Sequence, residues 1–228
     1  MDDTTFLYRT KSYNIVNWEC EALCIYITGG ISVKKSYKIT LGIALLVCIL
    51  VVFLYLGNYR LTGIDAAKSH FTIGEDAELI DEIDIGWGKV FIFKTKDGYY
   101  RTALSEKSGF LWRCKVAVFI KDNPEDKVKT IGWMSYTNKN REQITVLAVT
   151  TTDSRVAFIE TGSEPNRYRI PISLKKIAVF KCNKVMNIQE LNAVALSTNG
   201  KKLYYYGYPN KTTIIVNEDL RWYPILKD

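Results

Sequence analysis

The chain has 228 residues, of which 47% are hydrophobic and 24% charged, and its formal net charge is +7. This composition excludes a disordered polypeptide, and a single histidine excludes metal hydrolysis by a histidine cluster. The part beyond residue 57 is long enough for one domain with its own hydrophobic core.

Residues 1–38 are predicted to form a short, disordered cytoplasmic leader, because no hydrophobic period is sustained along them. Cys20 and Cys24 would supply only two of the four ligands that a structural zinc site needs. The one histidine, His70, falls on the far side of the apolar segment that begins at residue 39. We therefore expect no metal site.

Residues 1–32 are open to a second interpretation, in which the start site has been assigned too early. Val33, followed by two lysines, looks like the natural beginning of a membrane protein, and bacterial genes can begin at a valine codon. The nucleotide sequence of the gene distinguishes the two interpretations. A later start site requires a GTG codon at Val33 that is preceded by a purine-rich ribosome-binding sequence.

An uninterrupted apolar segment, Ile39–Leu56, organises the rest of the chain. As a helix it would reach about 27 Å, close to the thickness of a bilayer's hydrocarbon core. A helix buried in a soluble protein is seldom apolar on every face for so long. The sequence therefore predicts a transmembrane helix over residues 39–57, which makes the membrane this chain's first expected partner.

Basic residues on the two sides of this segment indicate its orientation. Lys34, Lys35 and Lys38 directly precede it, whereas Arg60 and Lys68 are the nearest cations beyond it. The positive-inside rule then keeps the amino end in the cytoplasm and places the carboxyl end outside. A cleaved signal peptide is the alternative, but the apolar run is long and no small-x-small cleavage site ends it.

Residues 58–74 are predicted to be a helical linker, because apolar residues within Gly63–Phe71 recur at spacings of three and four. The acidic segment Glu75–Asp84 that follows lacks the carboxylate spacing of a calcium loop. We interpret it as a strand or short helix with a solvated acidic face.

Residues 75–228 are predicted to form an extracytoplasmic β-rich domain. Short runs rich in β-branched and aromatic residues alternate with turn residues, and Asn199-Gly200 is the strongest hairpin signal. The fold class is α+β, mainly antiparallel β. The predicted strands are Lys89–Thr95, Tyr99–Glu106, Phe110–Lys121, Lys129–Tyr136, Gln143–Thr150, Val156–Glu160, Tyr168–Ile172, Lys176–Lys181, Val194–Ser197, Lys202–Tyr208, Thr212–Val216 and Arg221–Ile225.

Catalytic motifs are absent from the sequence. It contains no nucleophile elbow, no zinc-protease helix motif and no glycine-rich phosphate or dinucleotide loop. We therefore expect no catalytic residue, no small-molecule cofactor and no enzymatic activity. A hydrolase that acts through a pair of carboxylates stays open, because sequence spacing cannot place two acids across a cleft.

Aromatic residues provide the candidate binding surface. Tyrosines in a strand point to both faces of a sheet, so some are expected to be exposed beside lysines, where they would contact a protein or an envelope polymer. Ordinary core packing is the alternative. No nucleic-acid partner is expected outside the cell. The candidate residues are Trp87, Tyr204, Tyr206, Tyr208 and Trp222.

Cys114 and Cys182 are the only cysteines in the predicted external region. An oxidising exterior would allow them to form a disulfide if their α-carbons lie within about 7 Å. Two separately buried thiols are the alternative.

Residues 33–228 resemble the single-pass, membrane-anchored extracytoplasmic proteins of Gram-positive bacteria. The resemblance is to a general pattern and is carried by VKKSYKITLGIALLVCILVVFLYL, GKVFIFKTKDGYY, ITVLAVTTTDSRVAFIE and VALSTNGKKLYYYGYP. It implies a location in the bacterial envelope and a non-catalytic role in sensing or maintenance, and it transfers no functional residue. A single-pass signalling regulator remains a further alternative, since the leader would lie in the cytoplasm.

Overall fold

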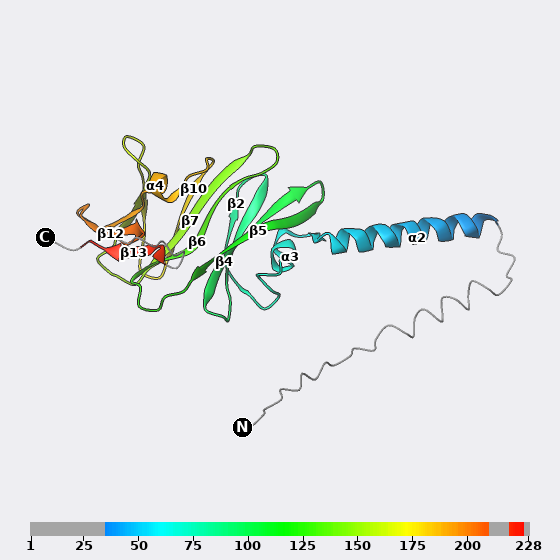
Figure 1. The fold of residues 1–228 in the computed structure, drawn as a ribbon, viewed down its shortest axis with the longest axis horizontal. Helices are drawn as coiled ribbons and strands as arrows, with labels where there is room; N and C mark the ends of the chain where they lie inside the picture. Colours follow the sequence, from blue (N-terminus) through cyan, green and yellow to red (C-terminus); the bar gives the residue numbers. More distant parts are fainter. Residues whose placement is uncertain (1–34, 210–218, 226–228) are drawn as a thin grey trace, which may run out of the picture. The chain divides into compact units, whose positions relative to one another are not determined.

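A computed structural model of the chain describes residues 35–209 and 219–225. These residues form mostly antiparallel β-sheets with a few helices, as the α+β, mainly antiparallel prediction required (Figure 1). The predicted leader up to residue 34, the start-site hypothesis and the predicted strand Thr212–Val216 lie outside the described residues.

The apolar segment forms the helix α2, Lys35–Leu56. Its stretch Tyr37–Leu56 is long and apolar enough to cross a membrane, and none of that stretch is buried against other described parts of the chain. The helix begins four residues before Ile39, where the predicted segment started. The chain divides into two compact units between Val51 and Val52, and the second unit holds the sheets.

Three antiparallel sheets make up the second unit, and within each sheet neighbouring strands are hydrogen-bonded in the order stated. Sheet A consists of β1 (Tyr59–Arg60), β5 (Leu111–Lys121), β4 (Tyr99–Ser108), β3 (Gly88–Lys94) and β2 (Glu78–Asp84). Sheet B consists of β10 (Ile177–Cys182), β7 (Gln143–Thr151) and β6 (Val128–Thr137). Sheet C consists of β13 (Arg221–Pro224), β12 (Lys202–Gly207), β11 (Val194–Leu196), β8 (Phe158–Thr161) and β9 (Tyr168–Pro171).

Sheet B packs against both of the other sheets, and its central strand explains how. Ile144 and Val146 of β7 belong to one hydrophobic cluster with Ile92 of sheet A. Leu147 and Val149 belong to a second cluster with residues of sheet C. Because successive side chains of a strand point to opposite faces, β7 is buried on both faces, and its middle, Val146–Val149, is apolar at every position.

A short helix, α3 (Gly63–Lys68), covers the other face of sheet A. Its Ala66 and Ala67 are fully buried in a cluster with Phe91 and Phe93 of β3. Within residues 58–74, predicted as a helical linker, the structure places β1, which pairs with β5, and α3, which packs on sheet A. Apolar spacing alone does not distinguish a linker helix from one that packs on a sheet.

Turn residues in the sequence predicted most of the strand ends. The acidic segment does form strand β2, with Ile83 buried and Glu82 exposed. The Asn199-Gly200 turn joins β11 to β12, and Gly200 has a φ of +79°, which glycine adopts without steric cost. The short helix α4 (Ile188–Leu191), with a capping box between Asn187 and Glu190, was not predicted.

Candidate functional site

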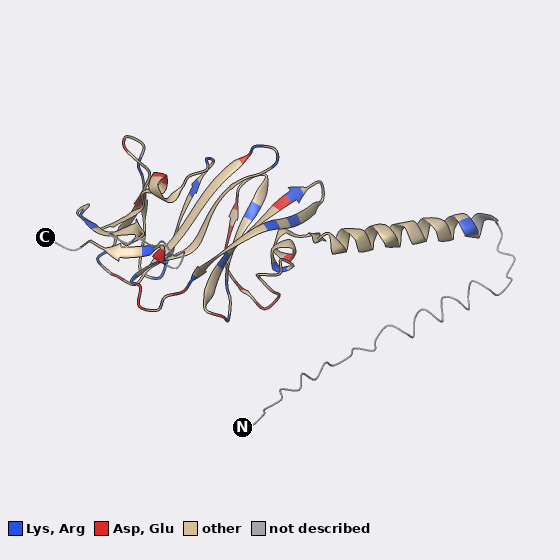
Figure 2. Ribbon diagram, viewed as in Figure 1, with Lys and Arg blue, Asp and Glu red and all other residues tan. Residues whose placement is uncertain are grey.

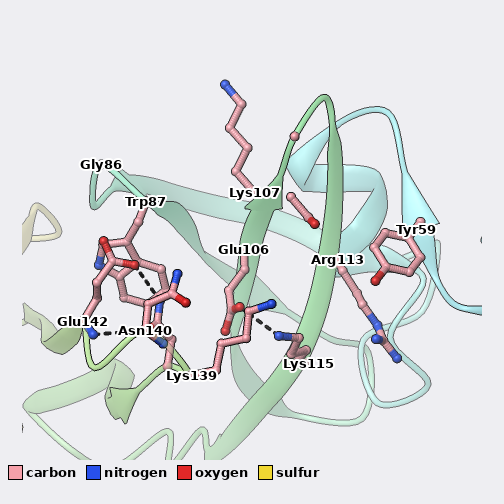
Figure 3. Close-up of a pocket in the computed structure, with 13 residues that line it drawn as sticks. Tyr59, Gly86, Trp87, Glu106, Lys107, Arg113, Lys115, Lys139, Asn140 and Glu142 are labelled. Atoms are coloured by element: carbon pink, nitrogen blue, oxygen red, sulfur yellow. Dashed lines mark hydrogen bonds and ion pairs between the residues drawn. The ribbon is translucent and has the colours of Figure 1, made fainter.

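The ends of three hairpins surround a cavity of about 620 Å³ in the second unit. The β2–β3 turn, the β4–β5 hairpin and the β6–β7 turn each contribute one wall, and sheet A and sheet B both border it (Figure 3). The lining residues are mostly polar. They are Tyr59, Gly86, Trp87, Glu106, Lys107, Ser108, Gly109, Arg113, Lys115, Asn138, Lys139, Asn140 and Glu142, and we call this space the Trp87 cavity.

Trp87 is the main aromatic wall of the cavity, and two glycines set its position. Gly86 has a φ of +86°, and the turn is closed by a hydrogen bond from the Ile85 amide to the Gly88 carbonyl oxygen, 3.1 Å. A Cβ at Gly88 would come within 2.7 Å of the Ser105 carbonyl oxygen, so a larger residue would push the turn away from β4. Trp87 is half-buried at the edge of the core, which leaves part of its ring for a ligand.

Glu106 is the buried carboxylate of the cavity, and both of its oxygens are engaged. Its Oε2 forms an ion pair with the Lys115 Nζ at 2.9 Å, and its Oε1 accepts a hydrogen bond from the Tyr136 hydroxyl at 3.1 Å. Burial, followed by the bond to Glu106, raises the pKa of Tyr136, so this phenol stays a hydrogen donor at neutral pH. Glu106 is thereby held in one orientation.

Asn138 builds the wall contributed by the β6–β7 turn. The buried amide oxygen of Asn138 accepts hydrogen bonds from the backbone amides of Asn140 and Glu142, both at 2.9 Å. Its Nδ2 donates to the Glu142 Oε2 at 2.7 Å. This local network keeps the turn in place and presents Lys139 and Asn140, both exposed, at the cavity.

Cationic side chains give the cavity a positive bias. The Arg113 guanidinium lies 5.2 Å from the centre of the Tyr59 ring, and Lys139 extends toward Glu106 and Lys115 (Figure 3). Figure 2 shows basic positions on β4 and β5 near the hairpin that joins these strands. Lys107 lines the wall but points away from the cavity, with its Nζ 5.8 Å from the centre of the Trp112 ring.

This arrangement suits recognition of a polar ligand with some negative charge. A half-buried tryptophan offers a flat surface, the exposed Asn140 offers an amide, and Arg113 offers a guanidinium fork for carboxylate or phosphate oxygens. Within residues 35–209 and 219–225, no three His, Cys, Asp or Glu side chains cluster as metal ligands would.

The five aromatic residues predicted as a binding surface do not form one. Trp87 lines the Trp87 cavity, whereas Tyr206, Tyr208 and Trp222 line a second cavity of about 420 Å³. Tyr204 lines neither of the two.

Burial contradicts the predicted exposure of Tyr204 and Tyr206 on β12 and of Trp222 on β13. Tyr204, Tyr206 and Trp222 retain 7%, 5% and 4% of their surface, because this face of sheet C packs against sheet B. The Trp222 Nε1 donates to the Thr130 Oγ1 of β6 at 2.9 Å. Core packing, the alternative interpretation, holds for these three residues.

The second cavity carries no assignment. Tyr208 and Leu220, which line it, stand on the two sides of residues 210–218, and these lie outside the described part of the chain. The Trp87 cavity is lined entirely by described residues, so it is the candidate site.

Cys114 and Cys182 are free thiols in the structure. Cys114 is buried in sheet A beneath α3, and Cys182 ends β10 in sheet B. Burial raises the pKa of Cys114 to about 12. The disulfide considered from the sequence is therefore not formed, because the two cysteines pack into different sheets.

Sequence reasoning found Trp87 but missed Glu106, Arg113, Lys115 and Asn138. The only local signal was the polar turn of residues 138–142, which reads as an ordinary hairpin end. Glu106 and Lys115 lie nine residues apart on paired strands, where alternating charges also describe any solvated strand face.

Comparison of the chain with protein-family models, with curated proteins and with solved structures gave no match.

Proposed function

We propose that this chain is a membrane-anchored extracytoplasmic domain that binds a polar, negatively charged segment of an envelope polymer or protein in the Trp87 cavity. The observation that carries the proposal is the combination, in one concave space, of a half-buried tryptophan, an arginine and the exposed Asn140 amide. Ligand sites typically combine an apolar wall with a few placed polar groups in this way.

Anchoring and orientation are supported by α2 and its flanks. A helix that is apolar around its whole circumference has no protein surface to cover it among the described residues, and a bilayer would cover all of it. Lys34, Lys35 and Lys38 at its amino end favour a cytoplasmic amino terminus. Alkaline phosphatase fused after Asp228 is expected to be active, and an inactive fusion would contradict this orientation.

A hydrolase is the second candidate, because two carboxylates, Glu106 and Glu142, line the same cavity. Against it stand their existing bonds. Glu106 is neutralised by Lys115 and bonded by Tyr136, and Glu142 accepts a bond from the Asn138 amide. Carboxylates bound in this way serve better to position a wall than to exchange protons. A signalling role depends on residues 1–34, outside the described part.

Ligand titration of the full chain in detergent micelles tests the binding proposal. The probes are a short polyglycerol phosphate, a hexaglutamate peptide and the neutral sugar maltoheptaose. Isothermal titration calorimetry measures the binding of each. We expect a charged probe to bind and the Trp87→Ala and Arg113→Gln variants to weaken its binding by about tenfold each.

The matched control is Trp133→Phe, which alters a half-buried tryptophan that lines the second cavity. This variant should bind as the unaltered chain does. Equal affinity in Trp87→Ala, or binding of none of the probes, would contradict the proposal. Hydrolysis of a probe that is lost in Glu142→Gln would favour the hydrolase.

A further inference from the structure

Only two residues separate the end of α2 from sheet A. Helix α2 ends at Leu56, and Tyr59 and Arg60 already pair with Arg113 and Trp112 of β5. Gly57 and Asn58 span at most about 10 Å even when extended. The edge of sheet A formed by β1 and β5 is therefore tethered close to Leu56.

Arg60 shortens this tether further. Its Nη1 donates to the Tyr55 carbonyl oxygen at 3.1 Å, and its guanidinium carbon lies 4.3 Å from the centre of the Tyr55 ring. The Gly57 amide donates to the Phe53 carbonyl oxygen at 2.9 Å. The last turn of α2 is thus bonded to the first strand of the domain.

Two large apolar side chains are exposed at the same edge. Leu61 directly follows β1 and is 73% exposed, and Phe110 forms the tip of the β4–β5 hairpin and is 78% exposed. Phe110 stands two residues before Trp112, which pairs with Arg60. Single exposed apolar residues are common on protein surfaces. Leu61 and Phe110, however, lie beside the connection to a membrane helix, where exposed apolar side chains can insert into the bilayer interface.

Three cations at this edge lie over aromatic rings. Besides Arg60 over Tyr55, Arg113 lies over Tyr59 and Lys107 lies over Trp112. Tyrosine, tryptophan and basic side chains with long aliphatic stems are the residues that concentrate at headgroup depth, where anionic lipids attract the charge.

We infer that the edge of sheet A made by Arg60, Leu61, Lys107, Phe110 and Arg113, which we call the juxtamembrane edge, rests on the lipid bilayer that holds α2. Anionic lipid headgroups contact its cations, and Phe110 inserts among the upper acyl chains. The inference depends on the proposed anchoring by α2.

The short tether favours the bilayer over a protein as the occupant of this edge. A helix of a partner protein is about 10–12 Å across with its side chains. The distance that Gly57 and Asn58 can span between the end of α2 and sheet A is no larger, so little room is left there for a partner protein between the bilayer and this edge. The Trp87 cavity shares Lys107 and Arg113 with the juxtamembrane edge, and Tyr59 of β1 also lines it (Figure 3). Its ligand would accordingly be met at headgroup level, attached to the membrane.

Photo-cross-linking of the full chain in vesicles tests the inference. The vesicles contain phosphatidylcholine, phosphatidylglycerol and a tracer lipid with a diazirine next to its headgroup, and cross-linked peptides are mapped by mass spectrometry. We expect lipid adducts at residues 59–61 and 107–113 as well as on α2. The Ser197–Lys201 turn of sheet C serves as the internal control and should carry none.

A matched pair of variants sharpens the test. Phe110→Asp should lower the adducts at residues 107–113 severalfold. Phe119→Asp should leave them unchanged, since Phe119 is also exposed, at 64%, but lies on β5 about 30 Å further along the strand. Circular dichroism confirms that both variants fold.

Two failures are distinguishable. A chain that does not float with the vesicles would overturn the anchoring by α2, and with it the proposed function. A chain that floats but carries lipid adducts only on α2, or cross-links its edge to a second copy, would overturn the juxtamembrane contact alone.

Discussion

Tyr204 on β12 donates its hydroxyl hydrogen to the Asp153 Oδ2 at 2.7 Å, across 51 residues of sequence. The Arg155 guanidinium binds the same carboxylate, with its Nη2 2.6 Å from Oδ2 and its Nε 2.9 Å from Oδ1. Bonds from Arg155, aided by the bond from Tyr204, hold the pKa of Asp153 well below its usual range. The loop between sheet B and sheet C is thereby fastened to β12.

This carboxylate predicts a specific acid sensitivity. Because its pKa is lower in the folded than in the unfolded chain, its stabilising contribution is complete above the unfolded value, about 3.9, and is lost as the pH falls further. Asp153→Asn should lower the free energy of unfolding at pH 7 and lose less stability than the unaltered chain between pH 5 and pH 2. Urea unfolding in micelles measures the free energy of unfolding at pH 7 and its change between pH 5 and pH 2. Glu125→Gln, which alters an exposed carboxylate, is the control and should change neither quantity.

Tyr204→Phe should cost about 1–2 kcal/mol at pH 7, because one hydrogen bond to a buried charged group is lost while the ring is kept. A Tyr204→Phe variant as stable as the unaltered chain would show that this bond contributes nothing.

Gly132→Ala should destabilise the contact between sheets A and B. The new Cβ would lie 2.6 Å from the Cδ1 of Ile92, whose side chain is fully buried. Overpacking of this kind costs about 1–3 kcal/mol. Ile92→Val removes that Cδ1, so the double variant should lose less stability than the two single losses added together. Strict additivity in thermal unfolding would contradict this account.

Trp222→Ala should act on stability and leave ligand binding in the Trp87 cavity unchanged once the chain is folded. Trp222 is buried, packs 5.3 Å from Tyr206 between ring centres and donates to Thr130, so its loss should cost about 3–5 kcal/mol. Tyr208→Ala, at a half-buried neighbour, should cost about 1 kcal/mol. If both variants lost only about 1 kcal/mol of unfolding free energy, Trp222 would have to be exposed rather than buried.

Cys114 should resist alkylation in the folded chain. Its buried thiol has a pKa of about 12, so almost no reactive thiolate exists at pH 8. Iodoacetamide at pH 8 should label Cys114 only after denaturation, and a reductant should leave the unfolding temperature unchanged. A peptide joining Cys114 to Cys182 in a non-reducing digest would contradict the free thiols of the structure.

The sequence by itself determined the kinds of element in this protein. The charge-free run that became α2 and the alternating runs ended by turns such as Asn199-Gly200 carry their period locally, and that period identifies a helix or a strand. The predicted strands within the described part are all present, each with at least one end shifted by one or two residues.

Tertiary structure alone decided which face of each strand is covered and which hairpin ends meet. Trp222 is buried because the fold brings it against Thr130, which lies 92 residues away in the sequence. Glu106 lines a cavity because the fold brings Tyr136 of another hairpin within hydrogen-bond distance of it. No local pattern records such pairings, since a buried and an exposed strand face have the same two-residue period and differ only in what another part of the chain brings to them.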